Sequence, residues 1–316
     1  FVGEFQWDSN FQISFNRNTL VALSGTTAAS IVGYGQWSDV VCVSEIGKPL
    51  YNFYGYIVEG VYESLEDIEN SPKTAKHPSN GVYNRANTVW VGDLKYKDIN
   101  EDGVINDQDR TDIGSPLPKF TFGWNNTFRY KGFDLNIFLN GSYGNKVLNY
   151  SLMNGPSGGL ASMRSAWVNQ NNDAIKDRAQ LVPIDPDKVY EDGSMWYNDI
   201  TNVKVANSGT KTPRPTLNDP NDNDRLSTRY IEDGSYLRIK NLTLGYTFPK
   251  KWMQKIKFDN IRIYCNIQNL YTFTKYSGYD PEVGASTQDS SGYAYGVDNG
   301  RYPSPTTYSF GVSLTF

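Results

Sequence analysis

Histidine and cysteine are scarce in this chain of 316 residues, which has one histidine, His77, and two cysteines, Cys42 and Cys265. The distance between the two cysteines fits neither a zinc site nor a redox pair, and nothing implies a disulfide. His77 stands in a Lys-His-Pro loop typical of an ordinary surface. No phosphate-binding glycine loop, nucleophile elbow or distinct carboxylate pair is present. The sequence therefore predicts no enzyme activity and no organic cofactor.

Long apolar runs and an excess of basic charge are also missing. No apolar stretch approaches the 18 residues of a transmembrane helix. The chain has 30 Lys and Arg against 34 Asp and Glu, a net charge of -4, so nucleic acid is not an expected partner. The mean hydropathy of -0.56 does not argue against a membrane barrel, because polar residues alternate with apolar ones in barrel strands.

Alternation of apolar and polar residues is the dominant pattern, and about ten such residues let a tilted strand cross a bilayer. One face of each stretch is rich in Phe, Tyr, Leu and Ile, and the other in Asn, Gln, Asp and Arg. The stretches are 7–15, 120–130, 133–140, 242–248, 261–268 and 308–316. We predict an all-β fold, a transmembrane antiparallel β-barrel with its apolar face in lipid and its polar face on a wet lumen.

The connections between these strands alternate in length. Those at 130–132 and 249–260 are short, whereas those at about 20–119, 146–235 and 275–306 are long. Short periplasmic turns and long extracellular loops are typical of outer-membrane barrels. Since the smallest closed barrels have eight strands, we expect residues 1–316 to be part of a larger barrel, with an N-terminal part preceding them.

Polar residues on the predicted lumen face are candidates for contact with a passing solute, or they simply solvate the lumen. They are Asn125, Arg129, Asn136, Asn140, Arg262, Asn266 and Gln268. The alternative to a barrel is a secreted, aromatic-rich β-sandwich that binds carbohydrate. In that alternative, exposed rings would stack on sugars, namely those of Trp37, Trp90, Trp196 and Tyr197.

A twelve-residue segment matches the spacing of a calcium-binding loop. Gly103 stands where the sharp turn is needed, and oxygen ligands occupy the key positions. The candidate ligands are Asp98, Asn100, Asp102, the carbonyl of Val104, Asn106 and Asp109. We predict a structural Ca²⁺ that fixes a long external loop, the alternative being a metal-free loop held by Asx turns.

Several motifs together resemble the SusC/RagA family of TonB-dependent transporters of Bacteroidetes, in order and spacing over nearly the whole chain. They include Gly47-Lys48-Pro49, Phe53-Tyr54-Gly55-Tyr56, Glu59-Gly60-Val61-Tyr62, Gly92-Asp93-Leu94-Lys95-Tyr96-Lys97-Asp98, Ile113-Gly114-Ser115-Pro116, Phe120-Thr121-Phe122-Gly123-Trp124, Ile231-Glu232-Asp233-Gly234-Ser235-Tyr236-Leu237-Arg238, Asn269-Leu270-Tyr271 and Tyr279-Asp280-Pro281-Glu282.

The resemblance implies that this chain is the C-terminal part of a 22-stranded outer-membrane barrel. It implies a SusD-like lipoprotein over the external loops, TonB as the energy source, and import of large nutrients, glycans or peptides. The N-terminal plug and the TonB box of the family match nothing in residues 1–316, so we expect both to be absent from this stretch.

Overall fold

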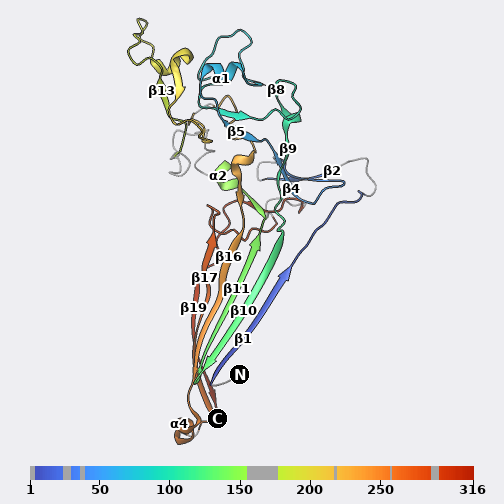
Figure 1. Ribbon diagram of the computed structural model, residues 1–316, viewed down its shortest axis with the longest axis vertical. Helices are drawn as coiled ribbons and strands as arrows, with labels where there is room; N and C mark the ends of the chain where they lie inside the picture. The colour runs from blue at the N-terminus through green and yellow to red at the C-terminus, as the bar shows by residue number, and fades with distance from the viewer. Residues whose placement is uncertain are drawn as a thin grey trace.

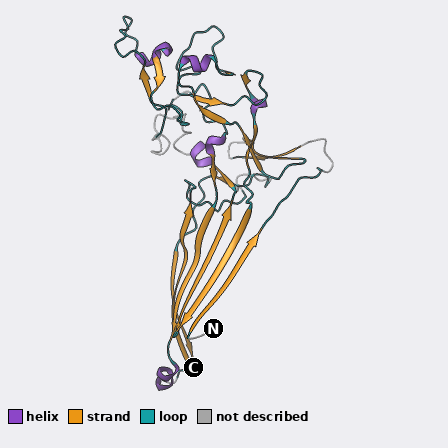
Figure 2. Ribbon diagram, viewed as in Figure 1, coloured by secondary structure: helices purple, strands orange, loops and turns teal. Residues whose placement is uncertain are grey.

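A six-stranded antiparallel sheet is the largest element of the computed structural model, which describes residues 4–23, 30–35, 40–154, 177–216, 219–256, 258–285 and 292–316. Figure 1 and Figure 2 show its long strands side by side. In spatial order they are β1 (Phe5–Ser14), β10 (Phe120–Tyr130), β11 (Phe133–Tyr143), β16 (Tyr236–Thr247), β17 (Asn260–Thr274) and β19 (Thr307–Thr315). They correspond to the six strands that alternation predicted.

Two short turns close one end of the sheet. Lys131 and Gly132 have φ angles of 47° and 88°, as a two-residue hairpin turn between twisted strands requires, and they pair Tyr130 with Phe133. The other turn contains the short helix α4 (Lys250–Ile256). Figure 1 shows α4 and both chain ends at this end of the sheet, and the long connections at the opposite end. The predicted alternation of short and long connections is therefore confirmed.

The register gives the sheet two chemically different faces. Trp7, Phe128, Leu135 and Leu244 follow one another across four strands on one face. Large apolar side chains on this face are exposed, up to 81% for Phe310. An apolar face left exposed across six strands would be unusual on a soluble monomer. Within the described residues no second β layer covers it, which does not fit the β-sandwich alternative.

Strands β16 and β17 extend further toward the long connections than the alternation predicted. The pairing shifts by one residue between Ile239 and Asn241, so the apolar period breaks there. Alternation resumes beyond the bulge at Leu237, out of phase with Leu242. A bulge interrupts the alternation in the sequence and looks like a strand boundary. The predicted strand therefore starts at 242, whereas β16 starts at Tyr236.

The described parts of the long connections fold into a separate layer, called here the crown, beyond the end of the sheet opposite α4 (Figure 1). Its paired strands are β2 (Ser30–Tyr34), β3 (Val40–Glu45), β4 (Asn52–Gly55) and β9 (Thr111–Gly114); β15 (Ile231–Asp233), β12 (Lys146–Asn149) and β18 (Val297–Asp298); β5 (Val58–Val61) and β7 (Leu94–Tyr96); β6 (Lys73–Thr74) and β8 (Val104–Ile105); β13 (Leu181–Pro183) and β14 (Val203–Val205). Its helices are α1 (Leu65–Glu69), α2 (Tyr150–Asn154) and the 3₁₀ turns η1 (Asp107–Asp109), η2 (Trp196–Asn198), η3 (Ile200–Asn202) and η4 (Thr228–Tyr230).

The crown contains the buried apolar cores of the chain. One core surrounds Trp90 and Tyr96, and a second surrounds Phe53 and Tyr230. The long connections are thus packed structures and not open loops. Within the described ranges, none of the helices has the length and apolar character needed to span a bilayer.

Candidate functional site

The polar face of the sheet carries all seven residues that the sequence placed on a lumen. Asn125 and Asn136 hydrogen-bond to each other, and Asn266 bonds to another amide on the same face. Asn136 Nδ2 donates to Asn125 Oδ1 at 2.9 Å and to Thr127 Oγ1 at 2.9 Å. Asn266 Nδ2 donates to Asn241 Oδ1 at 2.6 Å. Hydrogen bonds between neighbouring strands therefore hold these four amide side chains in fixed positions on the polar face.

An ion pair spans three strands near the turn end of this face. Arg262 on β17 donates to both oxygens of Asp134 on β11, at 3.0 and 2.6 Å. The strand between them carries Gly245, where a Cβ atom would lie 2.5 Å from Arg262 Nη2 and 2.6 Å from Asp134 Oδ1. The absence of a side chain at Gly245 gives the two long side chains room to meet in a two-point contact.

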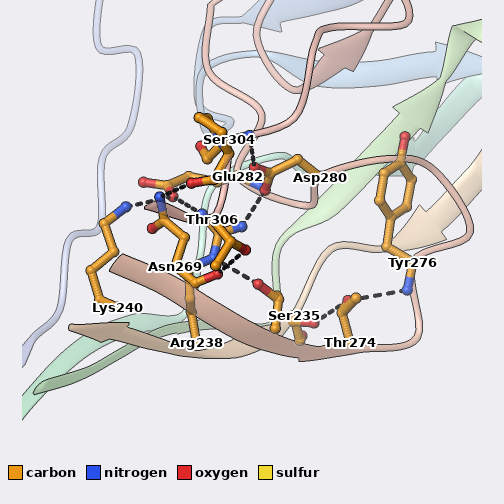
Figure 3. Close-up of polar contacts among 12 residues, drawn as sticks. Ser235, Arg238, Lys240, Asn269, Thr274, Tyr276, Asp280, Glu282, Ser304 and Thr306 are labelled. Carbon is orange, nitrogen blue, oxygen red and sulfur yellow. Dashed lines mark hydrogen bonds and ion pairs between the residues drawn. The ribbon is translucent and has the colours of Figure 1, made fainter. Parts of the chain in front are cut away.

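At the crown end of the same face, a buried arginine ties the segment after β17 to the sheet (Figure 3). The Arg238 guanidinium forms ion pairs with Asp280 and, at 2.8 Å, with Glu282. Its Nε donates to Thr272 Oγ1 at 2.8 Å. Lys240 Nζ adds a contact to Glu282 at 3.3 Å. Two acids and two bases therefore lie together where the wall meets the crown.

Asp280 is held ionised by its surroundings. Burial opposes its charge, but hydrogen bonds from the backbone N–H of Glu282, the Arg238 side chain and the backbone N–H of Ser304 outweigh that effect and lower the pKa of Asp280. The backbone distances are 3.0 Å from Glu282 and 3.2 Å from Ser304. Asp280 therefore anchors a second stretch of chain, around Ser304, to the same point.

This cluster borders a cavity of about 700 Å³ between the sheet and the crown, called here the mouth pocket. Thr121, Ser142 and Tyr236 line it from the polar face of the sheet. The other lining residues are Pro116, Pro118, Asn145, Lys240, Asp280, Pro281, Glu282, Val283, Gly284, Tyr295, Arg301, Tyr302, Pro303, Ser304 and Pro305. Charges of both signs and tyrosine rings suit a polar solute better than an apolar one.

Sequence reasoning did not single out Arg238, Asp280 and Glu282 as a site, although they stand in the motifs quoted above. The available signal was one arginine inside a strand and two acids in a Pro-containing turn. Arg238 lies 42 positions before Asp280 and 44 positions before Glu282. Only the pairing of β16 with β17 brings them together.

The predicted calcium ligands lie in one loop, but their side chains bind their own backbone. Asp98 accepts from the N–H groups of Glu101 and Gly103 at 2.7 and 2.8 Å. Asp109, which is buried, accepts from those of Ile99 and Asn106 at 2.9 and 2.8 Å. Asn100 and Asp102 accept from residues two positions on, Asp102 and Val104, at 3.2 and 2.9 Å. Within the described chain, no three His, Cys, Asp or Glu side chains converge on a metal-sized site.

The aromatic residues of the carbohydrate-binding alternative are placed differently from the expectation. Trp90 was expected to be exposed, which is wrong: it is 0% exposed in a crown core, because strands and loops close over it on every side. Trp196 and Tyr197 are half-buried, and their rings meet edge to face. Trp37 lies outside the described residues. His77 is half-buried and contacts the Tyr83 hydroxyl at 3.1 Å.

Comparison with known proteins agrees with this architecture. TonB-dependent receptor P3 of Formosa agariphila is 30% identical over 321 residues, covering 99% of this chain and 27% of the relative. TonB-dependent receptor SusC of Bacteroides thetaiotaomicron is 24% identical, covering 99% of this chain and 25% of SusC. The resemblance to the SusC/RagA family of TonB-dependent receptors is confirmed over 99% of this chain. No family model matches it.

Solved structures confirm the fold of this chain. The RagAB peptide transporter matches with a TM-score of 0.62 and 18% identity, covering 99% of this chain and 27% of that one. The RagAB peptide importer in its open-open state matches with a TM-score of 0.59 and 19% identity, over 99% and 27% of the two chains. The chain spans about a quarter of the length of the relatives it matches, and these are receptors and transporters, not enzymes.

Proposed function

We propose that this chain forms part of the barrel wall of a TonB-dependent importer in the bacterial outer membrane. The observation that carries the proposal is one sheet with an uncovered apolar face and an ordered polar face. Lipid would wet the first face, and an aqueous passage would run along the second. Since β1 and β19 each pair on one side only within the described sheet, the remainder of the barrel would supply their other neighbours.

In the assembled importer, the crown would lie outside the cell and the turn with α4 in the periplasm. A SusD-like lipoprotein would cover the crown, and TonB would act on the part of the protein outside this chain. The cargo would be an oligosaccharide or a peptide that passes the mouth pocket. RagAB is a peptide importer by name, which supports the peptide alternative, whereas the tyrosines of the pocket suit either cargo.

Two adjacent residues of β16 provide a test of the wall. Leu244 lies on the apolar face and is 51% exposed, whereas Thr243 lies on the polar face. Each is replaced by cysteine in the full-length protein with Cys42 and Cys265 removed, and a spin label is attached. We expect the label at 244 to be accessible to oxygen from the bilayer, and the label at 243 to be accessible to a water-soluble nickel reagent. Equal accessibility of both labels to the nickel reagent would refute the proposal.

Partnership with the lipoprotein and TonB has separate readouts. Full-length protein purified gently from native outer membranes should retain a SusD-like lipoprotein in equimolar amount, and cells lacking TonB should lose uptake while keeping the protein in the membrane. Absence of the lipoprotein would contradict the lipoprotein as a partner, and uptake unchanged without TonB would contradict TonB as a partner. Neither result would contradict the proposal that the sheet is part of a barrel wall.

We also propose that the loop at 98–109 binds a structural Ca²⁺. The support is the spacing of its oxygen ligands, together with Glu101 and Gly103 at φ angles of 59° and 81°, which curl the loop around its acidic side chains. The Asx contacts already order the loop without metal, so substitution alone is ambiguous. Asp98→Asn with Asp102→Asn keeps an acceptor at each position but lowers the charge.

Limited proteolysis at 90–115 in the full-length protein separates these alternatives. If Ca²⁺ is bound, chelator should speed cleavage in the parent chain and have no added effect in the double variant. If chelator leaves the parent unchanged, the loop is held by its Asx turns and the calcium proposal fails.

A further inference from the structure

A second cavity, of about 600 Å³, lies in the crown away from the mouth pocket. It is called here the crown pocket. Residues from three separate stretches of the chain line it: Tyr83, Asn84, Arg85, Ala86, Asn198, Arg214, Pro215 and Thr216. The only charged side chains in this set are two arginines. The identity of any ligand therefore depends on whether those two charges already have partners.

Arg214 already has its partner. Its Nε lies 2.9 Å from Asp93 Oδ1, and both side chains are buried, at 3% and 0% exposure. Its Nη2 donates to Asp93 Oδ2 at 3.2 Å and reaches the backbone carbonyl of Arg85 at 3.5 Å. A buried pair of this geometry neutralises itself. Arg214 thus shapes the crown pocket and positions the Arg85 backbone without offering a free charge.

Arg85 has no such partner. Its guanidinium stacks on the Tyr197 ring at 5.0 Å, and its Nε is buried without a hydrogen-bond acceptor. Among the described acids, none forms an ion pair with it. Burial and the nearby charge of Arg214 lower the pKa of Arg85. A half-buried cation without a carboxylate partner is stabilised by an anion, and the stacked ring holds its planar fork in place for one.

The rest of the lining supplies neutral polar groups. Asn198 and Thr216 present an amide and a hydroxyl, and Tyr83 adds an aromatic ring to the same wall. Amides, hydroxyls and a ring face are the groups that recognise the hydroxyls and apolar face of a sugar. We propose that the crown pocket binds the carboxylate or sulfate group of an acidic sugar, with Arg85 holding the anion. This site is distinct from the passage along the sheet and does not depend on import.

Calorimetric titration of the full-length protein in detergent at low salt tests the site with defined probes. Glucuronate should bind saturably, and glucose should bind at least tenfold more weakly because it lacks the anion. Arg85→Gln should weaken glucuronate at least tenfold, and Arg85→Lys should give an intermediate loss because the charge remains without the fork. Lys211→Gln, which removes one exposed positive charge from the crown outside the pocket, should leave the affinity unchanged.

Each other outcome overturns the proposal. Equal losses in Arg85→Gln and Lys211→Gln would mean unspecific charge attraction. Tighter binding of N-acetylaspartate than of glucuronate would mean that the pocket takes an acidic peptide, and inorganic sulfate binding as tightly as glucuronate would mean that the sugar is not recognised. Uptake of a neutral cargo should be unaffected by Arg85→Gln, so failure of this site and failure of the importer proposal are distinguishable.

Discussion

At the scale of single residues, buried arginines determine which distant segments stay together. Arg238 joins the sheet to the segment that follows β17, and Arg214 joins two stretches of the crown through Asp93. A buried guanidinium without a carboxylate is strongly unfavourable, whereas a paired one specifies a single arrangement. The Arg238 pairs therefore hold the segment after β17 against the sheet, and the Arg214 pair holds the crown together internally.

Arg238→Gln should release the segment at 279–284. Asp280 would lose its cation and Glu282 would keep only its contact with Lys240. Removing one partner of a buried pair destabilises by about 3–5 kcal/mol. Since Glu282 is half exposed, we expect the lower end of that range and at least a tenfold rise in local hydrogen exchange. Exchange measured by mass spectrometry on the full-length protein checks this, with β10 as the unaffected reference.

Acid should have the same local effect. The pKa of Asp280 is lower in the folded chain than its ordinary value of 3.8 in the unfolded chain. The stabilisation that Asp280 gives to the segment at 279–284 is therefore complete above pH 3.8 and is lost as the pH falls through the folded pKa. Exchange at 279–284 that stays slow in Arg238→Gln at neutral pH would show that the ion pairs do not hold this segment.

A second residue responds to pH in the opposite direction. Burial, with repulsion from Asp224 and Asp93, raises the pKa of Asp219 to about 7 despite hydrogen bonds from Asn223. The folded crown therefore keeps a proton that the unfolded chain loses near 3.8, so local stability should fall between about pH 4 and 7 and level off above. Exchange at 221–224, corrected for its intrinsic pH dependence, should be faster at pH 8 than at pH 5. Asp219→Asn should remove the difference, and a difference that persists would assign it to another group.

At the scale of elements, the sequence predicts the sheet well and the crown poorly. Each long strand has one uncovered apolar face over about ten residues, so its alternation is regular and visible. Crown strands such as Val40–Glu45 are short and buried on both sides, so their alternation is lost. Their partner strands lie far along the chain, as β9 does for β4, and the local sequence of a strand does not predict so distant a partner. The mouth pocket escaped sequence reasoning for the same reason.

Contact between β17 and β19 depends on a glycine. Tyr264 lies opposite Gly311, and a Cβ atom there would be 2.3 Å from the Tyr264 ring. Gly311→Leu should displace the ring and destabilise the full-length protein by about 1–3 kcal/mol, as overpacking does. Thermal unfolding in detergent, followed by tryptophan fluorescence, measures the loss.

Two variants separate overpacking from a general effect of leucine on this strand. Adding Tyr264→Ala to Gly311→Leu should recover most of the unfolding temperature, because the ring is no longer there to be displaced. Ser309→Leu, on the same face two residues earlier, should have little effect. A double variant no more stable than Gly311→Leu would mean that the ring does not require the glycine.

At the scale of the whole molecule, the two faces of the sheet suit two different solvents. Its polar face carries amide side chains that hydrogen-bond across strands, as Asn136 and Asn125 do, whereas a face packed on a soluble core would be mainly apolar. Its apolar side chains lie open, and their aromatic rings pair across strands, as Trp7 does with Phe128. The similarity to TonB-dependent receptors, the chemistry of the two faces and the one-sided edges all support the proposed wall between lipid and water.

Neighbouring residues in the middle of β1 turn this argument into a measurement. Phe11 is 58% exposed on the apolar face, and Asn10, which precedes it, lies on the polar face opposite Asn125. Phe11→Arg should lower the free energy of unfolding from liposomes by about 2–4 kcal/mol, the penalty for arginine near the bilayer midplane, whereas Asn10→Arg should change it by less than about 1 kcal/mol. Phe11→Leu measures the part due to lost contact with Phe122, since leucine removes the ring without adding charge. Equal losses in the two arginine variants would mean that both faces meet the same solvent, and the sheet would then not be a membrane wall.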